Sequence, residues 1–465
     1  MVFSSLQFIF IFMPIFFLGY YLVPAKYKNF ILLLGSLSFY FVGAFYHPEH
    51  FILFLLCMIM DFYIGRAIYQ HKLNKKWFLC LGLLLHLSFL FVFKYANFIF
   101  GEIKHFFGLD LPWHIFLPIG ISFYTFQGIS YLIDIYRGEI KPEKSLLSFA
   151  VYISMFEQLI AGPIVTYGTI QNRLHDRKID VKSAVQGLEV FVFGLGLKVL
   201  LANPVGKLFT DVQNIGFESI STLLAWMSIF AFTFQIYFDF FGYSLMAIGL
   251  GKMLGFEIPK NFDFPYTSTS MTEFWRRWHI TLGSWFREYV YIPLGGNRKN
   301  HIRNILNLCV VWLLTGIWHG AGYNFLLWGF SLFIIITFEK FFLKKYLDKW
   351  KWLGHVYMFF LIPLTWAIFA IDDVSEMGTF FQRLFPLFGG GFWSVFRYDY
   401  LKYFKLYWIF FLFGTIFSFE FPFRYLKKLD EKNHIFIQII LLVIFLGSTY
   451  CMYKGFDDPF LYFRF

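Results

Sequence analysis

Charged side chains are scarce in this sequence. Only 15% of its 465 residues are Asp, Glu, Lys or Arg, whereas about 25% is usual in soluble domains. There is also no hydrophilic block long enough to fold separately. Hydrophobic residues make up 58% of the chain and aromatic residues 24%. These proportions exclude an ordinary soluble protein and predict an all-α polytopic membrane protein with a single domain over residues 1–465.

Cysteines and the motifs of several enzyme classes are also rare or absent. The four cysteines stand singly inside apolar segments without a CxxC pair, so neither a disulfide framework nor a cysteine-ligated metal is expected. The sequence has no Walker A loop, no HExxH and no GxSxG, and the glycines of residues 249–255 miss the dinucleotide-binding spacing by one residue. ATP-driven transport and zinc hydrolysis are therefore unsupported, and we expect no bound metal.

Acidic residues are outnumbered, and the net charge is +11. Lys26 and Lys28 follow the first apolar run, and Lys75 and Lys76 follow the third, whereas residues 43–50 contain no Lys or Arg. This alternation is typical of short loops retained in the cytoplasm. It predicts an N-terminus outside the cell and argues against nucleic-acid binding.

Apolar runs recur along the whole chain. A helix needs about 20 apolar residues to cross the hydrocarbon core, and we expect about eleven to thirteen membrane helices, counting broken or re-entrant ones. One run, near residues 146–165, is expected to enter the membrane without crossing, because the basic residues after it break the alternation of the loops. The candidate runs are approximately 5–23, 30–46, 50–65, 78–100, 112–135, 146–165, 185–205, 222–254, 304–319, 322–342, 352–371, 404–420 and 434–452.

Residues 274–298 concentrate charge, aromatic rings and a histidine. At about 100° per residue, Trp275, Trp278 and Trp285 fall on one face of a helix. Arg277 falls roughly opposite. So much charge disfavours a crossing, and we expect an amphipathic helix that lies in the interface or is buried against other helices. Pro293 and the glycine pair after it are expected to end this helix.

A histidine at bilayer depth, His319, lies in the apolar stretch of residues 305–338. Such a group costs free energy unless it is buried and partnered. It is either a general base, since imidazole accepts a proton near neutral pH, or a neutral histidine that bonds two helices together. The flanking Gly320 and Gly322 favour the base, because they let a substrate or another backbone come close. The other histidine of interest, His279, lies beside three tryptophans and fits an orienting or packing role better.

Further polar groups lie inside other apolar runs. Asp239 needs a cationic partner, which we expect to be one of three arginines, Arg276, Arg277 or Arg287. Asp239 itself fits a structural role better than a catalytic one. Gln127 and Gln158 are interpreted as helix glue or as tunnel lining.

Together these residues resemble a known family. Residues 274–279 read FWRRWH, residues 285–298 read WFREYVYIPLGGNR, and residues 318–320 read WHG. This combination resembles the membrane-bound O-acyltransferases, specifically their bacterial alginate O-acetyltransferase branch, and the similarity extends over nearly the whole chain. The resemblance implies a ring of helices around a thin core, with a funnel from each side of the bacterial cytoplasmic membrane.

The resemblance also implies a reaction and a site. His319 matches the catalytic histidine of the family, and His279 matches a second functional histidine. The donor would be a cytoplasmic acyl thioester, either acetyl-CoA or an acyl carrier protein, with no bound cofactor. An extracellular partner of the SGNH-hydrolase type would complete delivery to a polysaccharide. The residues expected to line the substrate tunnel are Trp318, Gln127, Gln158, Asp239, Tyr243, Trp275, Arg276, Arg277, Trp278, Trp285 and Arg287.

One departure from the branch concerns the acyl group. Residues 242–245 read GYSL, where the branch usually reads GYSD. This blurs the distinction from the D-alanyl transferases that modify teichoic acids, although the segment at 291–298 and the chain length favour acetyl. A membrane transporter or scaffold, in which the histidines and Asp239 merely line a solute path, is the alternative of a different class.

Residues 460–465 read FLYFRF and resemble the hexapeptide that ends some enzymes of this branch. In that setting the tyrosine is proposed as a covalent acyl carrier. A phenol, with a pKa near about 10, becomes a nucleophile when a base such as His319 removes its proton. Tyr462 is therefore either an acyl carrier or an interfacial aromatic anchor.

Overall fold

The computed structural model describes residues 2–111, 113–160, 162–298, 300–386, 397–455 and 461. These ranges contain helices, turns and loops, and no β-strand. Eight of the described helices are long and apolar enough to cross a membrane, or nine if the bent pair α19 (Asp399–Phe417) and α20 (Phe421–Lys432) is one span. The larger number of helices expected from the sequence included broken and re-entrant ones, and the other apolar runs form shorter or broken helices. The predicted all-α polytopic fold is confirmed.

The chain divides into two compact units. The first comprises Met1–Phe191 and Met246–Pro259, and the second comprises Val192–Leu245 and Lys260–Phe465. Two long helices, α9 (Val181–Gly196) and α11 (Thr222–Leu254), contribute residues to both.

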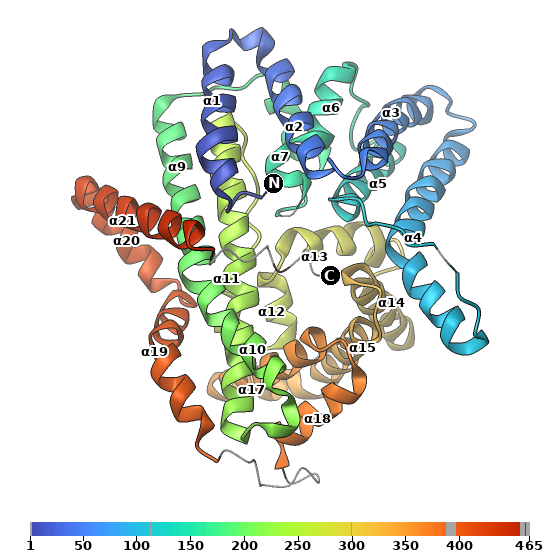
Figure 1. Cartoon of the computed structure of the whole chain (residues 1–465). Coiled ribbons are helices and arrows are strands. Elements are labelled where there is room, and N and C mark those ends of the chain that lie inside the picture. The colour runs from blue at the N-terminus through green and yellow to red at the C-terminus, as the bar shows by residue number, and fades with distance from the viewer. Residues whose placement is uncertain are drawn as a thin grey trace. The chain divides into compact units, whose positions relative to one another are not determined.

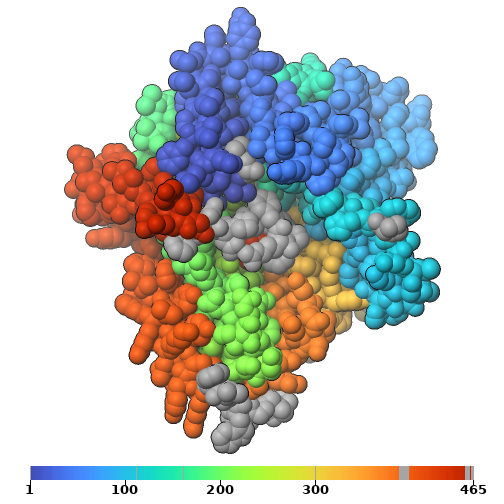
Figure 2. Space-filling view, viewed as in Figure 1, coloured from blue at the N-terminus to red at the C-terminus, as the bar shows by residue number. Residues whose placement is uncertain are grey.

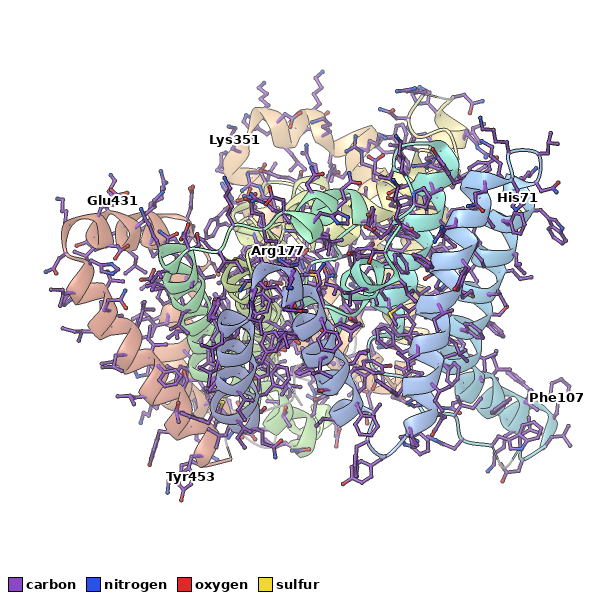
Figure 3. The ribbon with its side chains drawn as sticks, turned by 90° about the horizontal axis from the view of Figure 1, so that it is seen from above. His71, Phe107, Arg177, Lys351, Glu431 and Tyr453 are labelled. Atoms are coloured by element: carbon purple, nitrogen blue, oxygen red, sulfur yellow. The ribbon has the colours of Figure 1, made fainter. Side chains whose placement is uncertain are left out.

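In the first unit, α3, α4 and α5 pack against one another. Figure 3 shows α4 running from the neighbourhood of His71 to Phe107. The run near residues 146–165 breaks into α6 and α7, neither as long as a crossing, which agrees with a segment that enters without crossing. Before α9, the helices and helical turns of this unit are, in chain order, a π-helical turn Phe8–Phe12, α1 (Met13–Leu22), a 3-10 turn Ala25–Tyr27, α2 (Lys28–Gly43), α3 (Pro48–Gln70), α4 (Lys75–Phe107), α5 (Ile121–Arg137), α6 (Leu146–Ser154), α7 (Phe156–Leu159) and α8 (Tyr167–His175).

The second unit holds the two histidines of interest. Its helices follow one another as the π-helical turn Leu197–Ala202, α10 (Asn203–Ile215), the 3-10 turns Phe217–Ser219 and Pro265–Thr267, α12 (Met271–Arg277), α13 (Ile280–Phe286), the π-helical turn Arg287–Tyr291, α14 (His301–His319), α15 (Tyr323–Phe338), the π-helical turn Glu339–Leu343, α16 (Lys344–Lys349), α17 (Lys351–Ala370), α18 (Val374–Leu384), α19, α20 and α21 (His434–Tyr453). Figure 1 shows α12 and α13 as separate short helices, followed by the α14–α15 pair.

Two glycines bring α14 and α15 into close contact. A methyl group added at Gly316 of α14 would stand 2.4 Å from the Phe325 carbonyl oxygen, and one added at Gly329 of α15 would stand 2.5 Å from the Trp312 carbonyl oxygen. Small residues permit this backbone approach between membrane helices. The crossing fixes the C-terminal end of α14, where His319 lies, against α15.

Helices α19 to α21 carry much of the exposed apolar surface of the second unit. They appear in orange and red in Figure 2, and side chains such as Phe404, Leu406 and Val443 are more than half exposed. An apolar surface of this kind suits contact with lipid tails. The chain is thus a multi-pass membrane protein.

Candidate active site

The backbone breaks at His279. The hydroxyl of Ser270 accepts the Glu273 N–H at 3.1 Å and starts α12, an arrangement typical of a Ser-x-x-Glu helix start. His279 has φ 44°, a left-handed conformation that is uncommon for any residue but glycine, and α13 begins at Ile280. The single helix expected through residues 274–289 is therefore wrong, because one left-handed residue divides it in two.

Asn261 holds this break in place. Its carbonyl oxygen accepts the Ile280 N–H at 2.9 Å. Its side-chain oxygen accepts the N–H and the hydroxyl of Thr281 at 3.2 and 2.9 Å, and it lies 3.1 Å from His279 Nδ1. An atom that accepts a main-chain N–H must be the amide oxygen, so His279 Nδ1 carries a proton and donates it. Burial lowers the pKa of His279 to about 3, so the ring is neutral and its Nε2 is unprotonated.

His319 is the last residue of α14 and lies among aromatic rings. Its ring meets Trp318, Trp328 and Phe369 edge-to-face, at centroid distances of 5.1, 5.0 and 5.3 Å. The chain then turns away at Gly320, where an added methyl group would stand 2.1 Å from the Phe325 ring. Glycine is therefore favoured at position 320, because the Phe325 ring packs against the turn that follows His319.

The two histidines share Trp318 and one cavity. The Trp318 ring lies 5.1 Å from His319 and 6.2 Å from His279, centroid to centroid. Both histidines line a cavity of about 660 Å³, and both are at least nine-tenths buried. An imidazole in a cavity of this size is accessible to a substrate yet largely shielded from bulk water.

The cavity wall is aromatic and apolar, with cationic groups at its exposed positions. Trp275 lies 5.2 Å from Trp312 and 5.4 Å from Trp328, and these close contacts make the wall stiff. Arg276 and Arg287 line the cavity from solvent-exposed positions. The described lining contains no aspartate or glutamate. It therefore suits a neutral group near the histidines and an anionic group near the arginines.

Asp239 has a different partner from the one expected. Its carboxylate forms a buried ion pair with Lys198, and the Lys198 ammonium also donates to Asn203 Oδ1 at 3.4 Å. The other carboxylate oxygen accepts the Leu461 N–H at 2.7 Å. The expected pairing of Asp239 with an arginine is wrong, because Lys198 of the π-helical turn Leu197–Ala202 forms the ion pair instead.

The expected arginines are occupied elsewhere or exposed. Arg277 bonds Glu273 at 2.6 Å and Thr267 at 3.1 Å. Arg276 donates to the Thr272 carbonyl at 3.3 Å. The Arg287 side chain is 71% exposed and lies 3.8 Å from Glu288.

The structure brings only some of the expected tunnel residues to the cavity. Trp275, Arg276, Trp278 and Arg287 line it with the two histidines. The residues placed elsewhere in the second unit are Asp239, Arg277, Tyr243, buried on α11, and Trp285, buried against Tyr289 at 5.2 Å. Gln127 and Gln158 are buried in the first unit, where Gln158 donates to the Tyr152 carbonyl at 2.9 Å. Tyr462 lies outside the described residues.

Sequence reasoning missed two residues of the cavity wall and the partner of Asp239. Trp312 and Thr315 line the cavity at seven and four positions before His319, a helical spacing that places them on its face of α14. That spacing was available in the sequence. Lys198 was signalled by being a single charge inside an apolar run, but nothing in the sequence paired it with Asp239.

Comparisons with known proteins agree with this architecture. A family model described as MBOAT, membrane-bound O-acyltransferase, matches residues 137–371. The chain is 38% identical to a probable alginate O-acetylase of Pseudomonas aeruginosa over 398 residues, 83% of this chain and 75% of the relative. It is 34% identical to a peptidoglycan O-acetyltransferase of Helicobacter pylori, over 81% of this chain and 78% of the relative. A teichoic acid D-alanyltransferase of Bacillus subtilis is 25% identical, over 62% of this chain and 74% of the relative.

The structure is a multi-pass helical fold in which two buried histidines line one cavity, an arrangement that suits a membrane enzyme. The family match and the identity over most of the chain add the reaction type. The chain belongs to the membrane-bound O-acyltransferase family and is an O-acyltransferase.

Proposed function

We propose that this enzyme transfers an acetyl group from a cytoplasmic thioester across the bacterial cytoplasmic membrane, for O-acetylation of an extracellular or cell-wall polysaccharide, with His319 as general base. The observation that carries the proposal is the cavity, which joins His319 and His279 within a largely apolar wall. The relatives' names, alginate O-acetylase and peptidoglycan O-acetyltransferase, support acetyl as the group and a polysaccharide as the acceptor.

The chemistry begins with proton removal. A hydroxyl group of the acceptor lies against the His319 imidazole, which takes its proton as the oxygen attacks the thioester carbonyl carbon. A carbon–oxygen bond forms and the carbon–sulfur bond breaks. The proton held by His319 passes to the leaving thiolate, so that an ester and a free thiol remain. Exclusion of water by the aromatic wall limits wasteful hydrolysis of the thioester.

His279 has a positioning role in this scheme. Asn261 fixes its tautomer, so its unprotonated Nε2 is an acceptor of constant orientation. Its ring also meets Trp318, the residue before His319, on one side. A fixed ring here maintains the position of Trp318 and, through it, of the His319 end of α14.

Acetyl fits the cavity better than D-alanyl. A D-alanyl thioester carries an ammonium group, and a cation in a dry cavity needs a carboxylate or other negative partner. The described lining offers none and instead includes Arg276 and Arg287. Those arginines suit the phosphates of coenzyme A or of a carrier-protein prosthetic group. The D-alanyl alternative draws its support from the similarity to a teichoic acid D-alanyltransferase.

Replacement of His319 tests the base. We expect His319→Ala to abolish acetylation of the cell-surface polysaccharide while the protein folds and inserts normally. His301→Ala is the matched control, because His301 lies at the other, exposed end of the same helix and should leave acetylation unchanged. Acetylation retained by His319→Ala would refute the assignment.

The donor is tested with purified enzyme in membrane vesicles. We expect consumption of acetyl-CoA or of an acetylated carrier protein, with a free thiol released for each ester formed. D-alanyl carrier protein should not be consumed. The reverse preference would favour the teichoic acid reaction.

Tyr462 is proposed as an intermediate acyl carrier between His319 and an SGNH-type extracellular partner. The resemblance of residues 460–465 to the hexapeptide supports this step. Intact-mass measurement after exposure to the donor should show an acetyl adduct on the wild type and none on Tyr462→Phe. An adduct that survives the substitution would exclude the carrier role and leave direct transfer.

The orientation with the N-terminus outside is also a proposal, supported by the positions of Lys26 and Lys28 after the first helix. Cysteine introduced at Lys26 should react with a membrane-permeant maleimide and not with an impermeant one added to intact cells. Labelling by the impermeant reagent would reverse the orientation.

A further inference from the structure

A cluster of three ligand-type side chains lies at the start of α3 in the first unit. Two imidazoles and one carboxylate belong to it, those of His47, Glu49 and His50, and their candidate ligand atoms all lie within 4.8 Å of one another. His47 Nδ1 lies 3.0 Å from Glu49 Oε1. The rings of His47 and His50 stack with their centroids 5.1 Å apart.

The cluster is supported from the segment before α5. The Phe116 ring lies 4.2 Å from the His47 ring, centroid to centroid. His50 is 5% exposed and meets Phe93 edge-to-face. Ring contacts thus hold both imidazoles at the start of α3.

The donor set matches one metal class. Two imidazoles and one carboxylate are typical ligands of zinc and of similar divalent transition metals, whereas magnesium and calcium prefer oxygen ligands alone. Zinc holds such ligands at about 2.0–2.2 Å in tetrahedral geometry, so its ligand atoms stand about 3.3–3.6 Å apart. The candidate atoms here lie within 4.8 Å of one another, so binding requires side-chain rotations that bring them closer together.

We propose that His47, Glu49 and His50 form a binding site for a divalent transition metal ion of the zinc type. Three protein ligands leave one coordination position open for water or an anion. A bound ion would tie the turn before α3, where the His47 ring contacts Phe116, to the first turn of that helix. The sequence predicted no bound metal, so this proposal differs from that expectation. It does not depend on the proposed acyl transfer.

The test is a zinc titration of the full chain in detergent, purified through a tag without histidine, in competition with a chromophoric chelator. The wild type should take up one equivalent of zinc, and an excess of magnesium should not compete. Groups that merely support a ligand change metal affinity by about 10–100-fold, so the exposed-side double variant His47→Ala/Glu49→Gln should weaken zinc binding by at least about 100-fold.

His71→Ala is the matched control. His71 caps the opposite end of α3 (Figure 3), roughly 35 Å away at 1.5 Å per residue, and its loss should leave the titration unchanged. Zinc should also raise the thermal unfolding midpoint of the wild type and of His71→Ala, but not that of the double variant. No stoichiometric uptake by the wild type, or equal binding and equal midpoint shift in the double variant, would overturn the site.

Discussion

The two cavity histidines are held by opposite means. His279 is fixed by hydrogen bonds, because Asn261 accepts from its Nδ1 and from the residue after the next, Thr281. His319 is enclosed by Trp318, Trp328 and Phe369, whose rings form edge-to-face pairs with its imidazole. The described contacts of His279 specify its tautomer, whereas those of His319 specify the position of its ring.

This difference supports the different roles proposed for two chemically identical side chains. A ring whose Nδ1–H is committed to an amide and whose protonation is opposed by burial is poorly suited to cycle between charged and neutral forms. A base that cycles needs contact with the substrate, and the cavity that His319 lines provides room for that contact. The comparison therefore predicts chemistry at His319 and positioning at His279.

The largest expected effect separates the two roles directly. Asparagine tolerates the left-handed backbone of residue 279, so His279→Asn removes the ring while keeping the turn. We expect His319→Asn to lower the rate of acyl transfer by about 10²–10⁴-fold, as for loss of a general base. His279→Asn should lower it by no more than about 100-fold, as for a misplaced group. Equal losses in a thioester-consumption assay would show that both rings act chemically.

The aromatic enclosure of His319 is tested at Gly320. A methyl group there would stand 2.1 Å from the Phe325 ring, so Gly320→Ala should destabilise the protein by about 3 kcal/mol and reduce activity. Thermal unfolding in detergent measures the first effect. Gly378→Ala in α18 is the control, because its methyl group would meet nothing within 4 Å and helix propensity favours alanine. Equal behaviour of the two variants would contradict a tightly packed His319 turn.

The burial of neutral His279 predicts a pH dependence of stability. Its pKa is about 3 in the folded protein and near about 6.5 in the unfolded chain, so the unfolded chain binds more protons between these values. The contribution of His279 to the free energy of unfolding is therefore fully present above about pH 6.5. It falls as the pH is lowered, by about 2 kcal/mol between about pH 6.5 and 5. Unfolding midpoints across that range should fall less steeply in His279→Asn. Identical slopes would mean that His279 is not the group that opposes protonation.

The smallest expected effect concerns Asn261, whose side chain holds His279. Asn261→Ala removes the acceptor of His279 Nδ1 and of the Thr281 N–H, which we expect to cost about 1 kcal/mol or slightly more. The rate of acyl transfer should fall by less than in His279→Asn, and its pH profile should keep the wild-type shape, since His319 is untouched. A changed pH profile would indicate that Asn261 acts on the reacting group.

Much of the architecture could be read from the sequence because membrane insertion depends on local composition. The recurring apolar runs predicted the all-α polytopic fold, and the break near residues 146–165 was signalled by the basic loop after it. The motifs around 274–298 and 318–320 identified the family. The amphipathic-helix prediction failed at His279, since helical periodicity assumes helical backbone at every residue and one left-handed residue ends it.

The sequence by itself determined that this chain lies in the membrane and that it is an O-acyltransferase. The tertiary structure decided which groups meet. Asn261 reaches His279 from 18 residues away, Lys198 reaches Asp239 from 41 residues away, and Trp318 connects the two histidines. These pairings depend on how helices cross and where a helix breaks, and no short-range pattern of apolar and polar residues specifies either.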